Sequence, residues 1–141
     1  MNHKKYSKLL IFLLLTSSVA KAMSREDMSG IWIYENFSVY LDIPIKGKVF
    51  QCRIAENGIV ITAYGTLIGI ESIIWGAISA VDSSGKKFNY AAILPKDFTG
   101  WGKESISFEN ESLILNGDYG PARHFRYKEI PPECEYQRVN S

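Results

Sequence analysis

The chain has 141 residues, 22% of them charged and 13% aromatic, and its 16 basic residues are nearly balanced by 15 acidic ones. This length suits one domain with a modest hydrophobic core and leaves no room for a second domain of ordinary size. The sequence contains neither the basic surface that nucleic-acid binding requires nor a basic amphipathic helix for a membrane surface, so both classes of partner are excluded.

The first 22 residues have the three parts of an export signal. Lys4, Lys5 and Lys8 form a basic start, Leu9–Leu15 is an unbroken apolar run, and Ala20–Ala22 supplies small residues before a cleavage point. The apolar run is shorter than the roughly 20 residues that a membrane-spanning helix needs. We therefore expect a cleaved signal peptide at 1–22 and a periplasmic or secreted domain at 23–141.

Removal of the signal peptide changes the charge of the chain. Four lysines leave with residues 1–22 and no acidic residue does, so 12 basic residues remain against 15 acidic ones, a net charge of −3. His3 also leaves, and His124 is the single histidine of the mature chain. A mildly acidic chain is not expected to bind nucleic acid or an anionic membrane surface. No membrane span is expected in the mature form.

Residues 23–29 are polar and are expected to form a short helical turn or to lie loose. After them, short runs rich in β-branched and aromatic residues alternate with turn residues, which predicts strands. The expected strands are 30–35, 37–43, 48–54, 58–64, 70–80, 87–94, 106–108, 113–115 and 123–129. Asn57-Gly58 predicts a tight hairpin. The 70–80 run is long enough for a helix, but its β-branched residues and Gly76 favour a bulged strand.

Eight or nine short strands predict an all-β, antiparallel fold, either an up-and-down barrel or a sandwich. The alternation of apolar and polar residues supports a half-buried sheet, since Val39, Leu41 and Ile43 share one face. No segment has helical periodicity. Pro131-Pro132 is expected to end the regular structure and to leave a polar C-terminal tail.

Cys52 and Cys134 are the two cysteines of the chain. In an oxidising compartment we expect a disulfide between them, and the alternative is two separate buried thiols. The bridge would tie the C-terminal tail to an early strand and would stabilise the fold by about 4–5 kcal/mol on the loop-entropy model. Pairing would also remove both sulfurs as nucleophiles and metal ligands.

The start of the first predicted strand, Gly30-Ile31-Trp32, resembles the G-x-W motif of lipocalins and their calycin relatives. The resemblance implies that Trp32 closes one end of an up-and-down barrel. It also implies that an arginine near the last strand packs across this Trp, with Arg126 in that role and Arg123 as the alternative.

The same family often ties a C-terminal tail to an early strand by a disulfide, which is similar to the bridge expected for Cys52 and Cys134. The chain departs from the family after Lys128, where a Pro-rich polar tail takes the place of the usual helix. A barrel of this size would have an interior filled by side chains. A second resemblance, to small periplasmic lysozyme inhibitors, rests on size, compartment and strand content.

Catalysis and metal binding are not expected. A zinc site needs about three or four nitrogen, sulfur or carboxylate ligands, and His124 is the one imidazole available. We expect this histidine at a surface or strand position, and no G-x-S-x-G motif accompanies it. Glu104, Glu109 and Glu111 are expected to lie at a solvated hairpin end and not across a cleft, where glycoside hydrolysis would need a carboxylate pair. The sequence thus predicts no catalytic residue, no metal and no cofactor.

Binding residues are expected in the loop 95–103, because it carries two large aromatic side chains flanked by charged ones. Such a composition is typical of interface hot spots. The alternative is that both aromatic side chains fold inward and plug a barrel end. The candidate partner-binding residues are Lys96, Asp97, Phe98, Trp101, Tyr119 and Arg123. Trp75 is expected in the core or on a strand face.

These features favour an exported, non-enzymatic binding protein, most concretely an inhibitor or immunity protein that blocks a cell-wall-degrading enzyme or toxin by protein–protein contact. The alternative is a lipocalin-like carrier of a small apolar ligand. A third hypothesis is an enzyme that uses carboxylates alone. An open apolar interior would favour the carrier, and a filled interior with exposed binding residues would favour the protein-binding function.

Overall fold

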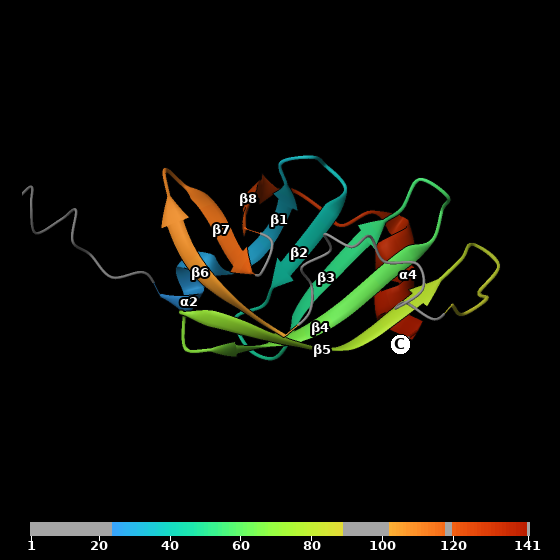
Figure 1. Cartoon of the computed structure of the whole chain (residues 1–141), viewed down its shortest axis with the longest axis horizontal. Helices are drawn as coiled ribbons and strands as arrows, with labels where there is room; N and C mark the ends of the chain where they lie inside the picture. The colour runs from blue at the N-terminus through green and yellow to red at the C-terminus, as the bar shows by residue number, and fades with distance from the viewer. Residues whose placement is uncertain (1–23, 89–101, 118–119, 141) are drawn as a thin grey trace, which may run out of the picture.

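The computed structural model describes residues 24–88, 102–117 and 120–140. Eight antiparallel strands follow one another around a closed barrel, and β1 completes the circle by pairing with β8 (Figure 1). The strands are β1 (Gly30–Tyr34), β2 (Val39–Ile43), β3 (Val49–Ile54), β4 (Val60–Ile68), β5 (Ser72–Val81), β6 (Lys103–Glu109), β7 (Ser112–Gly117) and β8 (Gly120–Tyr127). The predicted all-β antiparallel fold is confirmed, as a barrel and not a sandwich.

The local predictions for the strands also hold. Gly58 has a φ of 82° in the hairpin that joins β3 to β4, as Asn57-Gly58 predicts. The 70–80 run forms β5, and its pairing with β4 shifts register between Ala63 and Tyr64, which is the expected bulge. Of the strand predicted at 87–94, only an isolated bridge between Lys87 and Val81 lies within the described residues.

Two helices accompany the described strands, α2 (Arg25–Met28) and α4 (Pro132–Asn140). The first is the expected short turn, which Ser24 begins through a capping box with Asp27. The second corrects the prediction of an irregular C-terminal tail. Pro132 does not end regular structure, because proline is favoured in the first turn of a helix, where its missing N–H has no partner to lose. Acidic residues in the first turn and Arg138 in the last complement the helix dipole.

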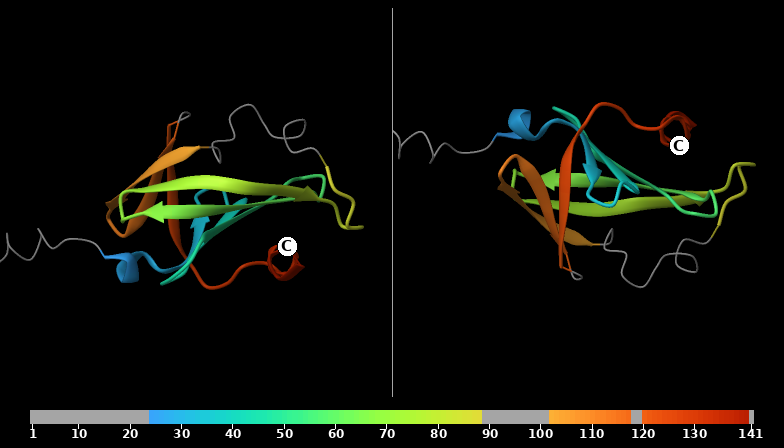
Figure 2. Two further views of the ribbon diagram at one scale, coloured as in Figure 1. Left: turned by 90° about the horizontal axis from the view of Figure 1, so that it is seen from below. Right: turned by 90° about the horizontal axis from the view of Figure 1, so that it is seen from above.

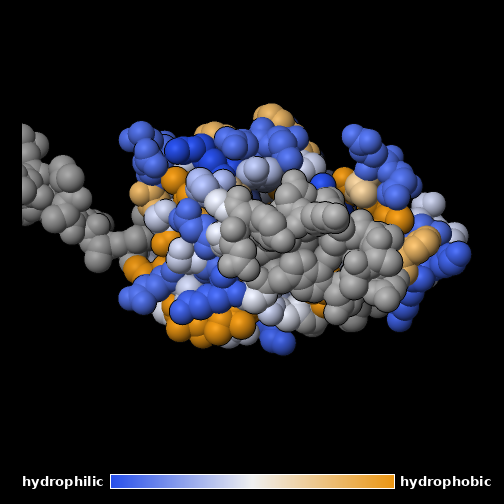
Figure 3. All heavy atoms as spheres, viewed as in Figure 1, coloured by the Kyte–Doolittle hydropathy of each residue, from blue (hydrophilic) through white to orange (hydrophobic). Residues whose placement is uncertain are grey.

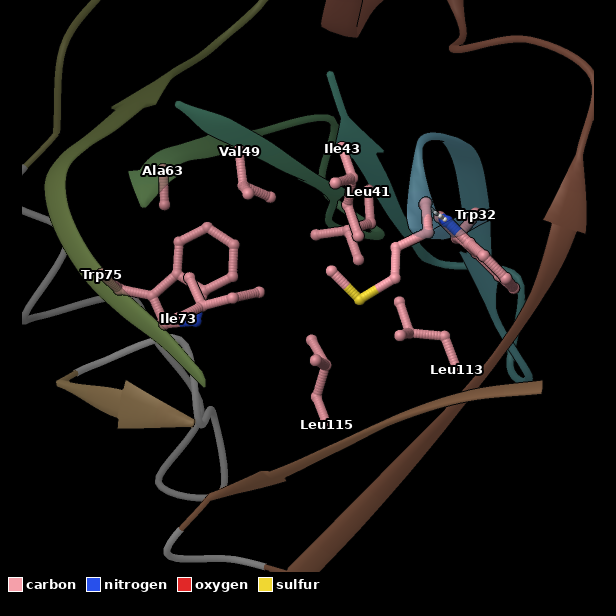
Figure 4. Close-up of a cluster of buried hydrophobic side chains, with 10 residues drawn as sticks. Trp32, Leu41, Ile43, Val49, Ala63, Ile73, Trp75, Leu113 and Leu115 are labelled. Carbon is pink, nitrogen blue, oxygen red and sulfur yellow. Dashed lines mark hydrogen bonds between the residues drawn. The ribbon is translucent and has the colours of Figure 1, made fainter. Parts of the chain in front are cut away.

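Large apolar side chains converge inside the barrel from β1 to β5 and from β7 (Figure 4). This core cluster consists of Met28, Trp32, Leu41, Ile43, Val49, Ala63, Ile73, Trp75, Leu113 and Leu115. Trp75 therefore lies in the core, as expected. Trp75 packs over Gly65, since a Cβ at that position would lie 2.7 Å from its Cε3 atom. The described interior is filled in the way that a small barrel requires.

A second apolar cluster lies outside the barrel wall, where α4 packs on β3 and β4 (Figure 2). Cys134 of the helix and Cys52 of β3 form the expected disulfide, and both are fully buried beside Phe50. Arg138 of α4 bonds the carboxylate of Asp42 on β2, and its guanidinium lies 5.3 Å from the centre of the Phe50 ring. The C-terminal segment is thus fixed to the early strands by covalent, ionic and apolar contacts.

Replacement of both cysteines by alanine is expected to lower the free energy of unfolding by about 4 kcal/mol, because the bridge joins residues 82 positions apart and restricts the unfolded chain. Urea unfolding of the two proteins measures this difference. Amide hydrogen exchange of α4 should rise at the same time, since the helix loses its covalent attachment. Equal stability and equal protection of α4 would show that the bridge is dispensable.

Gly65→Ala is expected to destabilise the barrel by roughly 1–3 kcal/mol, because the added methyl group overlaps Ile73 and Trp75 in a packed core. Gly76→Ala is the matched control, since a Cβ at Gly76 on β5 meets no atom within 4 Å. Urea unfolding of both variants measures the contrast. Similar losses for the two substitutions would contradict the close packing over Gly65.

Candidate functional site

One end of the barrel is closed by Trp32 and Arg126. The guanidinium of Arg126 lies 4.0 Å from the centre of the Trp32 ring, and Trp32 Nε1 donates a 2.9 Å hydrogen bond to the carbonyl oxygen of Met28. Arg126 also donates to the carbonyl oxygens of Asp27 and Ser29. It is therefore Arg126, and not Arg123, that packs across Trp32.

Gly30 has its own role at this closed end. Its φ is +120°, a conformation that favours glycine, and a Cβ there would approach the Nη1 atom of Arg126 to 2.9 Å. The polar groups of Trp32 and Arg126 are engaged within the chain. This end accordingly serves barrel closure.

Arg123 lies on the outer face of β8, in a row that the sequence did not identify. Residues two apart on a strand share a face, so Arg123, Phe125 and Tyr127 point outward together. We call these three residues the β8 strip. Phe125 is 44% exposed and Tyr127 is 38% exposed. The facing residues on the two neighbouring strands, Ile33 and Ile114, are buried, so the strip borders an apolar part of the outer wall.

The polar contacts of the β8 strip are weak. Arg123 Nη2 lies 3.4 Å from Glu109 Oε2, and both side chains are partly exposed. An exposed ion pair of this kind contributes about 0–1 kcal/mol, so Arg123 can exchange Glu109 for another carboxylate at little cost. The Tyr127 ring lies 5.9 Å from the ring of Tyr40, which holds it against β2. An arginine beside two exposed aromatic rings has the composition of an interface hot spot.

The other candidates for partner binding lie outside the described residues. These are Lys96, Asp97, Phe98, Trp101 and Tyr119. Their roles remain predictions, and Arg123 is the one candidate with a described environment. The alternation of residues 123–127 was a signal for the β8 strip, because it places Phe125 and Tyr127 on the face of Arg123.

The carboxylates do not converge on a cleft. Glu109 and Glu111 lie at the β6–β7 hairpin end, as expected. The expectation for Glu104 is wrong, because this residue is buried and its Oε1 accepts a 2.6 Å hydrogen bond from Trp75 Nε1. Within the described ranges, His, Cys, Asp and Glu form no group of three that could hold a metal ion, and no helix there has the length and apolarity to cross a membrane.

His124 faces the barrel interior from β8. The prediction of a strand position is correct, but a surface position is wrong, since the side chain is almost completely buried. Its Nδ1 lies 3.0 Å from the carbonyl oxygen of Ala122, and its ring lies 5.5 Å from the ring of Tyr34. Burial lowers the pKa of His124 to about 4, so the imidazole is neutral at pH 7.

Acidification is expected to weaken the fold through His124. Between its ordinary pKa of 6.5 and its folded pKa of about 4, the unfolded chain binds a proton at His124 that the folded chain does not. The free energy of unfolding therefore falls as the pH falls through this range, by about 3 kcal/mol in total. The contribution of His124 is fully present above pH 6.5.

Urea unfolding at a series of pH values measures this slope. His124→Asn is the matched variant, because its amide retains a donor for the Ala122 carbonyl oxygen and does not titrate. Its stability should change less than that of the original chain between pH 6.5 and pH 4. Parallel curves for the two proteins would exclude His124 as the cause.

The described residues form an eight-stranded antiparallel barrel that is compatible with a calycin-like barrel. Comparison of the chain with models of known protein families, with curated proteins and with solved structures finds no match. The resemblance to calycins therefore rests on the barrel itself and on its closed end, where Trp32 and Arg126 meet.

Proposed function

We propose that this chain is an exported, non-enzymatic binding protein that acts by protein–protein contact, as an inhibitor or immunity protein that blocks a cell-wall-degrading enzyme or toxin. The observation that carries the proposal is the β8 strip, an exposed row of two aromatic rings and an arginine on the wall of a filled barrel. The signal-like residues 1–22 and the Cys52–Cys134 disulfide support export to an oxidising compartment.

The β8 strip fits a protein partner better than a small molecule. Phe125 and Tyr127 lie on a convex outer wall, where a flat or shallow protein surface can cover both rings at once. Burial of such rings gives most of the binding energy at hot spots, and the surrounding contacts exclude water. Arg123 adds a charged donor for a carboxylate of the partner, which sets orientation and association rate.

A lipocalin-like carrier of a small apolar ligand is the second candidate, and one observation favours it. Gln51 is only 7% exposed and faces the interior from β3, and its Oε1 has no hydrogen-bond partner in the described structure. An unpaired buried acceptor costs about 1–3 kcal/mol, which a ligand with a hydrogen-bond donor would offset. The packed cluster around Trp32 and Trp75 leaves the protein-binding function as the better supported of the two.

Substitution of the β8 strip tests the first candidate. The protein should reduce the lysis of bacterial cell suspensions by at least one enzyme of a panel of lysozymes, amidases and other cell-wall hydrolases. Phe125→Ser and Arg123→Glu should each weaken this inhibition by roughly tenfold or more, since hot-spot residues contribute about 2 kcal/mol or more. Turbidity measurements at increasing protein concentration give the inhibition constants.

Ile45→Ser is the matched control, because Ile45 is 62% exposed in the β2–β3 loop, away from the β8 strip. It should inhibit like the unmodified protein, and thermal unfolding should show that all variants fold. Unchanged inhibition by the strip variants would reject the β8 strip as the contact surface. Failure of the protein to inhibit any hydrolase of the panel would reject this class of target.

A further inference from the structure

The barrel end opposite to Trp32 carries a hollow between two hairpins. The β1–β2 and β3–β4 hairpin ends lie at this end, and Figure 3 shows them as separate, largely hydrophilic projections along the upper edge with a dip between them. The hollow has a volume of 570 Å³, within the range of about 300–1,000 Å³ that small-molecule sites occupy. It is lined by Asn36, Ser38, Arg53, Ile54, Ala55, Glu56 and Asn57. We call it the loop-end hollow.

One of the two hairpins carries an exposed aromatic residue. Phe37 lies between two lining residues, is 68% exposed and has a φ of +61°. Bulky side chains rarely adopt positive φ, because the Cβ crowds the following carbonyl oxygen. A glycine would avoid this strain, and the exposed ring adds little to the core. The ring of Phe37 is therefore available to a ligand.

Two asparagines supply oriented hydrogen-bond donors. Asn36 Oδ1 accepts hydrogen bonds of 3.1 Å and 2.6 Å from the backbone and side chain of Ser38. Asn57 Oδ1 accepts a 3.2 Å bond from the backbone N–H of Ile59. These bonds hold the oxygen of each amide in its own turn. Both asparagines line the hollow, so each hairpin brings one amide group to it.

The charges of the hollow favour an uncharged ligand. Arg53 and Glu56 both line it, so the lining carries one positive and one negative group and no net charge selects an anion or a cation. The polar lining is unsuited to a purely apolar molecule. A suitable ligand is neutral, has several hydrogen-bonding groups and offers an apolar face to Phe37. Sugars combine these three properties.

We propose that the loop-end hollow binds a short oligosaccharide. Phe37 stacks on the apolar face of a sugar ring, Asn36 and Asn57 donate to its oxygens, and Glu56 accepts from its hydroxyl or acetamido groups. The lining of this site shares no residue with the β8 strip, although Glu35, next to Asn36, donates a 3.0 Å hydrogen bond to the carbonyl oxygen of Arg123. The proposal does not depend on the protein-binding function proposed for that strip.

A titration monitored by ¹H–¹⁵N correlation spectra tests the proposal with three probes: a trisaccharide of N-acetylglucosamine, maltotriose, and acetate as a small anion. The full protein with its disulfide intact should bind at least one of the two sugars, with shifts at residues 35–38 and 53–59. Binding of the amino sugar alone would identify the acetamido group as a recognised feature, and binding of both would identify ring and hydroxyl contacts. Both outcomes support the site.

Isosteric variants separate recognition from folding. Asn36→Asp and Asn57→Asp keep the Oδ1 acceptor of each turn but replace the donor by a carboxylate, and each should weaken sugar binding roughly threefold to tenfold. Phe37→Gly should weaken it by a similar factor and leave the melting temperature unchanged or higher, because it removes the strained φ. Ile45→Ala, an exposed aliphatic position at the other end of the barrel, should bind like the original protein.

Three results would overturn the proposal. The first is the absence of shifts with either sugar. The second is a response to acetate alone, which would identify a simple anion site at Arg53. The third is sugar binding that survives all three hairpin variants or produces shifts elsewhere, which would locate the sugar outside the loop-end hollow.

Discussion

The closure of the barrel depends on the pairing of the first strand with the last, and Arg126 packs across Trp32 within this pairing. Trp32 is fully buried, and Arg126 covers its ring from β8 while donating to carbonyl oxygens of the segment that precedes β1. A closed sheet has no free edges, but only if its two terminal strands are held in register. The cation–π contact and the hydrogen bonds to α2 supply that constraint at one end. The other end carries the β1–β2 and β3–β4 hairpins.

The filling of the interior decides where binding can occur. Trp75 packs over Gly65, and its Nε1 donates a hydrogen bond to the buried carboxylate of Glu104. The polar atoms of these two side chains therefore bond to each other inside the fold. Large ligands cannot enter such a core without displacing it, since protein interiors are close-packed. The side chains with unused binding capacity are instead on the outer face of β8 and at the loop-end hollow. A filled core of this kind favours binding at the surface.

The strands could be predicted from the sequence because their signals are local. β-branched runs, the Asn57-Gly58 turn and Gly76 within β5 each act over a few residues. The disulfide is predicted from the presence of two cysteines and of a signal-like segment at residues 1–22. Helix α4 could not be predicted, because its sequence is polar and has two prolines at its start. What stabilises it is non-local: the bond from Cys134 to Cys52 and the ion pair from Arg138 to Asp42.

The candidate sites also combine features that local sequence predicts with features that depend on non-local contacts. Alternation along residues 123–127 predicts that Phe125 and Tyr127 share a face with Arg123. It does not say which face is outward, because the opposite face also carries polar residues, His124 and Arg126. Only the pairing of β8 with β1 and β7 buries His124 and exposes the strip. The loop-end hollow is built from two hairpins that are distant in sequence, and the positive φ of Phe37 arises in the turn itself. Neither the loop-end hollow nor the positive φ of Phe37 has a sequence pattern of its own.

Two features of this barrel oppose its stability, one in the packed interior and one in the β1–β2 hairpin. The positive φ of Phe37 and the unpaired Oε1 of Gln51 each cost about 1–3 kcal/mol, which is large beside the net stability of about 5–15 kcal/mol that a small domain has. The disulfide contributes about 4 kcal/mol by restricting the unfolded chain, and it does so without using any side chain of the hairpins or of β8. It therefore offsets both unfavourable features without drawing on the residues that carry them. The backbone N–H of Phe37 donates a 2.8 Å hydrogen bond to the carbonyl oxygen of Tyr34, which holds the turn, while the exposed ring adds little to the core. A contact with a ligand is the interaction that would give this ring a role.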